Sequence, residues 1–236
     1  MTSIDLSFCN DRLRMTSLIP AVKRCLMIVM EIASKRPSGR PRSFDRDAAL
    51  ETAMRLFWKY GYEGVSFQQL TAALGIGAPS LYAAFGNKGA LYREALDRYA
   101  NMRGASDLSF MEAACSLREA VRLLLEGTAR GLVDPAGEVG CMLNTGMIAS
   151  HPDHEDLARD LAQRRAQFRA LLTDTLQRWV SREHATRLSS YVTAVMQGMA
   201  IQARDGFRQE RLQVVVDEAL KAVPDDSHTR TDVRQK

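Results

Sequence analysis

Apolar residues recur at helical spacing through most of this chain, and no segment alternates apolar and polar positions for long enough to predict a strand. The first clear pattern follows Asp45 and places five residues on one helical face: Ala49, Ala53, Leu56, Phe57 and Tyr60. Gly61 suits the left-handed position at which helices commonly end. The pattern predicts a supporting helix with Phe57 in its core, within an all-helical fold.

Two shorter apolar patterns follow, on either side of a glycine turn. Ser66 can cap the first helix, and Gln69 can reach back to close a capping box. Pro79 suits the first turn of the second helix, where its missing N–H would have no partner. Asn87 can cap a further helix that continues to Tyr99. Two short helices joined by a tight turn predict a helix-turn-helix, whose second member fits a DNA major groove.

From Phe44 to Tyr99 the chain resembles the DNA-binding domain of the TetR/AcrR transcriptional repressors. The resemblance rests on an aromatic helix ending in glycine, the turn S-F-x-x-L-x-x-x-x-G-I, the helix S-L-Y-x-x-F and a following lysine, in this order and spacing. It implies about nine helices, three of them in the DNA-binding end. It also implies a repressor that binds a palindromic operator in double-stranded DNA as a homodimer and is released by a small-molecule effector.

Ten residues are candidates for DNA contact. Tyr82 and Lys88 are expected to reach phosphates, and Arg40 and Arg42 of the arm KRPSGRPR are expected on phosphates or in the minor groove. A solvated linker is the alternative for this arm. The residues able to meet base edges are Gln68, Gln69, Ala78, Pro79, Ser80 and Ala83. This apolar reading surface favours thymine methyl contacts and indirect readout.

Beyond Tyr99 the periodicity predicts a separate helical body. Ser116 and Glu119 form another capping box before a helix of about four turns. A short apolar helix in GCMLNTGMIAS comes next, and three further helices are expected over about 153–182, 185–204 and 209–222. We expect an N-terminal extension over 1–34, a DNA-binding domain over 35–100, a ligand-binding and dimerisation domain over 101–223 and a disordered tail over 224–236.

Residues 1–34 fit poorly with the rest of the chain. A poorly ordered tail is the favoured interpretation, with Met30 as an alternative start. An additional amphipathic helix that includes CLMIVMEIA is the other.

The last two helices carry apolar stripes, and the resemblance implies that they form a four-helix bundle with a partner subunit. The dimerisation candidates are Leu188, Val192, Val195, Leu212, Val216 and Leu220. A stripe of this kind can instead be wholly intrachain core.

The middle helices are expected to enclose a ligand pocket with adaptable apolar walls. Its candidate residues are Thr128, Met142, Asn144, Met147, Phe168, Met196 and Met199. A ligand that favours one spacing of the two DNA-binding ends would lower the fraction able to bind DNA. Two alternatives stay open: a constitutive repressor without a ligand, and a redox switch at Cys141, although nothing near it in the sequence is obviously basic enough to lower the pKa of its thiol.

Charge supports the assignment of the DNA-binding end. The formal net charge is +4, and residues 35–103 hold 11 Lys and Arg against 6 Asp and Glu, whereas 104–236 hold 17 against 19. The basic excess therefore falls on the helix-turn-helix, as a polyanionic partner requires.

The remaining composition indicates a cytoplasmic protein. Four cysteines without a C-x-x-C pair are typical of reduced thiols: Cys9, Cys25, Cys115 and Cys141. No apolar run reaches the roughly 20 residues that span a bilayer, and the start does not resemble a secretory signal.

The sequence indicates no enzyme. No serine or cysteine stands in a nucleophile motif and no glycine-rich phosphate loop follows a strand, so we predict no catalytic residue and no cofactor. His151 and His154 flank Pro152, and the acidic residues after them suit a helix start. We therefore predict no metal site.

Overall fold

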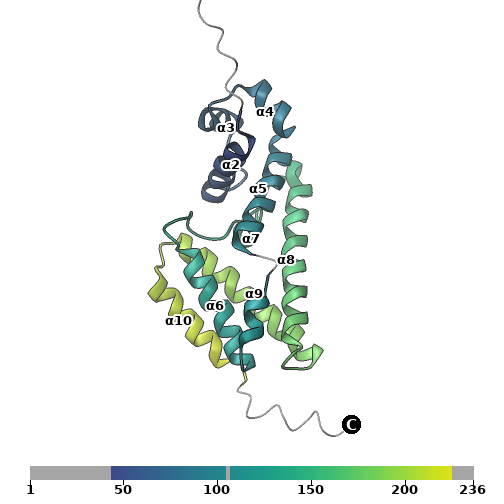
Figure 1. Ribbon diagram of the computed structural model, residues 1–236, viewed down its shortest axis with the longest axis vertical. Helices are drawn as coiled ribbons and strands as arrows, with labels where there is room; N and C mark the ends of the chain where they lie inside the picture. The colour runs from purple at the N-terminus through teal and green to yellow at the C-terminus, as the bar shows by residue number, and fades with distance from the viewer. Residues whose placement is uncertain (1–43, 105–106, 225–236) are drawn as a thin grey trace, which may run out of the picture. The chain divides into compact units, whose positions relative to one another are not determined.

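The computed structural model describes residues 44–104 and 107–224, and within these ranges every regular element is a helix (Figure 1). The all-helical prediction is confirmed: nine α-helices, α2 to α10, and two short 3-10 helices lie in the described ranges. Several predictions concern residues outside the described ranges: the N-terminal extension over 1–34, the Met30 start, the arm residues Arg40 and Arg42, and the tail after Pro224.

The first three helices, which we call the head, are α2 (Arg46–Tyr60), α3 (Phe67–Leu74) and α4 (Ala78–Phe85). Their predicted ends are confirmed. The Ser66 hydroxyl accepts a hydrogen bond from the Gln69 backbone at 3.1 Å, and the Gln69 side chain accepts one from the Ser66 backbone at 2.7 Å. Gly61 ends α2 with φ +73°.

The head packs around the apolar face of α2. Phe57 is buried as predicted, but Tyr60, assigned to the same face, is 53% exposed. Trp58 is buried instead, because its indole N–H donates to the Gly140 carbonyl at 3.1 Å, a contact 82 residues away in the sequence. This second buried face of α2 is therefore set by tertiary contacts that the local pattern does not contain.

Helix α5 (Lys88–Arg103) connects the head to the rest of the chain, and Asn87 caps it by accepting from the Ala90 backbone at 2.8 Å. A 3-10 turn, η1 (Ser109–Ala113), comes next. We call α6–α10 the body; it includes α6 (Leu117–Leu132), α7 (Met142–Thr145), η2 (Pro152–His154), α8 (Glu155–Leu176), α9 (Arg182–Arg204) and α10 (Gln209–Lys221).

One predicted helix end in the body is wrong, and one predicted capping contact differs. The helix expected over 153–182 ends at Leu176, because Ser181 must be extended to cap α9, where it accepts from the His184 backbone. The capping box at Ser116 is also displaced. Ser116 accepts from the Glu119 backbone as expected, but the Glu119 carboxylate accepts from the Cys115 backbone, one residue before the cap.

The head and α5 contact the body at several places. Along α5 and α8, Arg93 forms an ion pair with Asp156, and Arg164 forms one with Asp97 at 2.6 Å, where the two helices lie side by side (Figure 1). At the end of α2, Arg204 of α9 donates to the main-chain carbonyls of the last helical turn.

The contact made by Arg204 depends on a glycine. Arg204 donates to the carbonyls of Trp58 and Lys59, and its side chain lies over Gly140. Gly140 has φ +92°, and a Cβ there would lie 2.9 Å from Arg204 Nε. Any other residue at this position would be strained and would displace the arginine.

Candidate nucleic-acid interface and pocket

Helix α4 is held by two buried residues and leaves its other face open. Leu81 and Phe85 anchor it to the head with 2% and 4% exposure. Most of the predicted base-reading residues lie on exposed positions: Gln68, Gln69, Pro79, Ser80 and Ala83 are exposed and Ala78 is half-buried. The structure thus brings the candidates from α3 and α4 onto two neighbouring helices.

Tyr82, the tyrosine predicted to bind a phosphate, is exposed and is held in one orientation by Phe67. The Tyr82 ring is 53% exposed and stacks on Phe67, with 4.5 Å between ring centroids and 20° between planes. The side-chain amide oxygen of Gln69 is held in the capping box of α3. Gln68 therefore has more freedom than Gln69 to reach a base.

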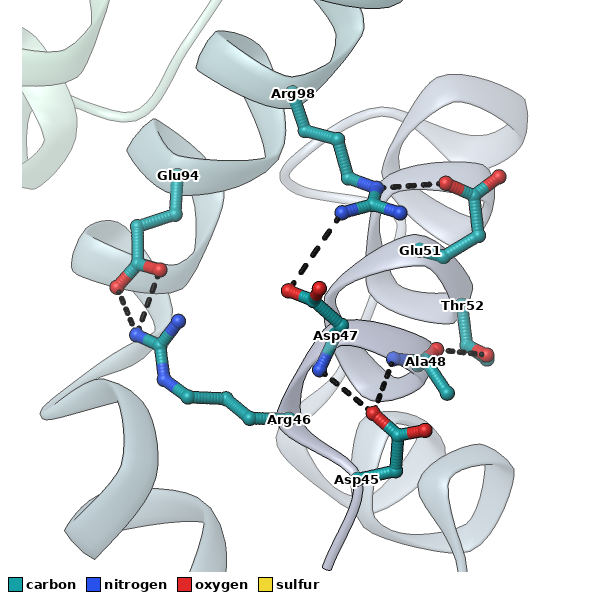
Figure 2. A network of polar contacts seen from close by, with 8 residues as sticks. All are labelled: Asp45, Arg46, Asp47, Ala48, Glu51, Thr52, Glu94 and Arg98. Atoms are coloured by element: carbon teal, nitrogen blue, oxygen red, sulfur yellow. Dashed lines mark hydrogen bonds and ion pairs between the residues drawn. The ribbon is translucent and has the colours of Figure 1, made fainter.

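Arg46, which sequence analysis did not single out, contacts both α4 and α5, and Figure 2 shows its ion pair with Glu94 of α5. Its Nε donates to the Ala84 carbonyl at 3.3 Å, and its Nη2 donates to both carboxylate oxygens of Glu94, at 2.8 and 2.7 Å. Its guanidinium also lies 4.5 Å from the centroid of the Phe85 ring. These partners are 38 and 48 residues away in the sequence, so no local pattern could reveal them.

The reading surface carries no formal charge. No Lys, Arg, Asp or Glu occurs in the sequence between Glu63 and Lys88. Lys88 is itself half-buried, with Nζ 4.0 Å from the centroid of the Tyr62 ring, and burial lowers its pKa. To make the predicted phosphate contact, Lys88 would have to use an ammonium group that already packs on the Tyr62 ring.

A pocket of about 770 Å³ lies among α5, α6, α7, α8 and α9. Four of the predicted ligand-binding residues line it: Thr128, Asn144, Phe168 and Met196. Met142 instead lines a smaller pocket of about 240 Å³ beside Phe57 of α2. Met147 and Met199 line neither pocket and are buried, Met199 completely, so the structure places them in the packed interior.

Cys141 lies in the wall of the larger pocket. Its sulfur caps α7 by accepting from the Asn144 backbone at 3.4 Å. Arg165 of α8 lines the same pocket and interacts electrostatically with Cys141. This basic residue comes from a distant part of the chain, so the local sequence around Cys141 does not indicate it.

The residues predicted for dimerisation face this chain's own core. Five of the six are buried in the intrachain core: Leu188, Val192, Leu212, Val216 and Leu220. The sixth, Val195, is half-buried. The five buried side chains pack in the hydrophobic core of this chain, and their assignment to a dimer surface stays a prediction. The residues of α9 left at the surface are another stripe: Tyr191, Ala194 and Ile201 are exposed, and Val195 and Gly198 are half-buried.

The histidines near the start of α8 have a structural role. Nδ1 of His154 lies 2.8 Å from Oε1 of Glu63, and the His151 backbone donates to the same oxygen at 3.3 Å. They connect the segment before α8 to the head. In the described ranges, no group of three His, Cys, Asp or Glu side chains could hold a metal ion.

Comparisons with known proteins agree on one family. The family model described as "Bacterial regulatory proteins, tetR family" matches residues 49–95. The HTH-type transcriptional repressor ComR of Escherichia coli (strain K12) is 36% identical over 199 residues, covering 81% of this chain and 94% of ComR. The repressor BdcR of the same strain is 30% identical over 194 residues, covering 80% of this chain and 95% of BdcR.

Solved structures give the same result. A cysteine variant of the TetR family transcriptional regulator CifR, complexed with 26-base-pair double-strand operator DNA, is 36% identical. It matches with a TM-score of 0.73 over 79% of this chain and 100% of that one. No helix in the described ranges combines the length and apolar character needed to cross a bilayer. The chain belongs to the TetR family and is a transcriptional regulator rather than an enzyme.

Proposed function

We propose that this protein is a repressor that binds a palindromic operator as a homodimer and leaves it when a small molecule occupies the pocket. The observation that carries the proposal is the exposed face of α4, held in place by Arg46 and by two buried residues, in a chain similar to CifR, which was solved on operator DNA. Such a helix has the size and exposure that major-groove binding requires. Because bacterial DNA lies in the cytoplasm, we place the protein there.

Tyr82 provides a direct test of the interface. Tyr82 and Tyr60 are both 53% exposed, but only Tyr82 lies on α4. A hydrogen bond from its hydroxyl to a phosphate should contribute enough that Tyr82→Phe weakens operator binding about tenfold. Tyr60→Phe should leave affinity unchanged. The measurement is a fluorescence anisotropy titration with DNA from the protein's own upstream region; equal affinities of both variants and wild type would contradict the proposed phosphate contact.

Because α3 and α4 carry no lysine or arginine, most contacts between a charged side chain and a phosphate must come from residues outside these two helices. We propose that Arg40 and Arg42, which lie outside the described residues, supply part of this charge. If each neutralises one phosphate, the double variant Arg40→Ala/Arg42→Ala should reduce the slope of log affinity against log salt by about 2. An unchanged slope would return the arm to its alternative interpretation, a solvated linker.

The second proposal concerns the dimer, which two half-sites of a palindrome require. We propose that the surface stripe of α9 forms it, since Ile201 is 48% exposed and a Cβ at Gly198 would meet open space. Ile201→Arg should then yield a monomer in analytical ultracentrifugation at micromolar concentration. Ile148→Arg is the matched control, because Ile148 is 65% exposed and lies outside α9. A dimer that survives Ile201→Arg unchanged would exclude this surface.

The pocket supports the ligand-dependent part of the proposal. We propose a DNA-binding domain over 35–100 and a ligand-binding and dimerisation domain over 101–223, with the pocket in the second. The volume of about 770 Å³ lies within the range typical of small-molecule sites. Its wall includes residues of α5, which also reaches the head, so a ligand can favour one spacing of the two heads.

One observation favours a second mechanism. Cys141 lines the pocket beside Arg165, so oxidation of its thiol could shift the same equilibrium. Loss of a peroxide response in Cys141→Ser would support the redox switch, and an unchanged response would remove it. A screen in which neither small molecules nor peroxide altered operator binding would favour the constitutive repressor.

A further inference from the structure

The wall of the larger pocket carries more positive than negative charge. Five charged residues line it: Arg103, Arg130, Arg164, Arg165 and Asp107. Three of the arginines have carboxylate partners, and the pairs are Arg103 with Asp134 at 3.7 Å, Arg130 with Glu126 at 3.8 Å and Arg164 with Asp97 at 2.6 Å. The carboxylate of Asp107 accepts from the Ser109 backbone at 2.9 Å.

Arg165 differs from the other three arginines. Its Nη1 donates to the carbonyls of Leu143 and Gly146, at 3.0 and 3.2 Å, at the end of α7. These two bonds fix the guanidinium in place but leave its positive charge unneutralised. Among the described residues, no carboxylate forms an ion pair with it, and its Nε and Nη2 donors remain available on a side chain that lines the pocket.

The adjacent arginine on α8 shows what a carboxylate partner would change. Burial lowers the pKa of Arg165, with no Asp or Glu to oppose it. At Arg164 burial acts in the same direction, but the hydrogen bond and charge of Asp97, together with Asp160, raise its pKa overall. Both side chains are half-buried, but only Arg164 has carboxylate partners. Arg165 is therefore a half-buried cation that a bound anion would stabilise.

Most of the remaining wall is apolar. Phe168 and Leu171 lie one and nearly two turns beyond Arg165 on α8, and Leu123, Leu124 and Met196 complete the apolar part from α6 and α9. These side chains can bury the hydrocarbon part of a ligand but offer it no hydrogen bonds. Thr128, Asn144 and Gln197 add neutral polar groups.

We propose that the pocket binds an amphipathic organic monoanion, a carboxylate whose head group pairs with Arg165 and whose apolar body lies along Phe168 and Leu171. The planar guanidinium can donate two parallel hydrogen bonds to a carboxylate, a geometry that a neutral ligand cannot match. This inference rests on the proposed ligand-binding role of the pocket. It adds the chemical class of the ligand and the residue that selects it.

The test compares acids with their own neutral amides. Four carboxylates of different shape (hexanoate, decanoate, phenylacetate and 1-naphthylacetate) and the corresponding primary amides are titrated into the full chain by calorimetry. At least one acid should bind about tenfold or more tightly than its amide. Arg165→Gln should reduce this preference to about twofold or less, and Arg165→Lys, which keeps the charge, should retain part of it.

Arg130→Gln is the matched control, because Arg130 lines the same pocket but has Glu126 as its partner. It should keep the preference for acids. The inference is overturned if no acid in the panel binds more tightly than its amide, or if the preference survives in Arg165→Gln. Should that variant fail to fold, the wild-type comparison and Arg165→Lys still decide.

A parallel operator-binding titration separates this inference from the proposed function. If an acid binds through Arg165 but DNA affinity does not change, the inference stands and ligand release fails. If only neutral compounds bind and release the DNA, the proposed function stands and the inference fails.

Discussion

The head and the body differ in the space left between their helices. In the head, Phe57, Trp58 and Leu70 are almost completely buried, and Phe57 meets Tyr92 of α5 edge to face at 5.1 Å. In the body, the helices leave a pocket of about 770 Å³ between them. Both regions have a packed core, and Leu125, Val192 and Met199 are fully buried in the body, but the larger pocket lies against the body helices and gives them room for a ligand. The comparison indicates that the larger of the two pockets lies away from the helices proposed to contact DNA.

Replacing one phenylalanine in each region tests this contrast and should give the largest change in the free energy of unfolding. Phe57 is 1% exposed in the head, and Phe168 lines the pocket. Phe57→Ala should lower the free energy of unfolding by about 3 to 5 kcal/mol, because it leaves a cavity in a packed core. Phe168→Ala enlarges a space that already exists and should cost about 1 kcal/mol. Urea denaturation measures both; equal losses would show that the pocket wall is packed as tightly as the core of the head.

The contact between head and body should give an intermediate effect. Arg204 donates to the carbonyls of Trp58 and Lys59 at the end of α2, so Arg204→Met leaves these acceptors without their charged donor. We expect a loss of about 1 to 2 kcal/mol in the free energy of unfolding. Ligand binding to the body should persist while its effect on operator affinity weakens.

Arg182→Met is the control for this variant, since Arg182 is the exposed first residue of the same helix. This variant should change neither the free energy of unfolding nor the effect of a ligand on operator affinity. If a ligand changes operator affinity as much in Arg204→Met as in wild type, the contact between α5 and α8 transmits the effect instead.

Local signals in the sequence were sufficient for most of the head. The caps at Asp45, Ser66 and Asn87 involve residues within three positions, and helical periodicity placed Phe57 in the core, where it is 1% exposed. These features depend on neighbours along the chain. They could therefore be predicted without knowledge of the tertiary structure.

Features that depend on distant segments could not be predicted. Periodicity identified Val192 and Val216 as buried but could not tell whether their own chain or a partner covers them. The carbonyl partners of Arg165 come from residues 19 and 22 positions away, on another helix. The same limit explains why three of the predicted ligand-binding methionines lie outside the larger pocket: an apolar residue at a helical position fits core and cavity equally well.

The smallest predicted effect concerns the ion pairs between α2 and α5 (Figure 2). Arg98 Nε donates to Glu51 at 2.7 Å, and this bond lowers the pKa of the Glu51 carboxyl, while partial burial opposes it. A lowered folded-state pKa means that the ionised carboxylate stabilises the fold. The contribution is fully present above the unfolded-state pKa of about 4.5 and is lost as the pH falls through the folded value.

Glu51→Gln should therefore be less stable than wild type at pH 7, by a few tenths to about 1 kcal/mol, as is usual for ion pairs near the surface. The difference should shrink below about pH 4.5, where wild type becomes protonated. Urea denaturation at pH 7 and at low pH measures it. Glu183→Gln is the control, because its ion pair with Arg187 is far more exposed and should contribute less at either pH. A difference independent of pH would mean that Glu51 acts through packing and not through its charge.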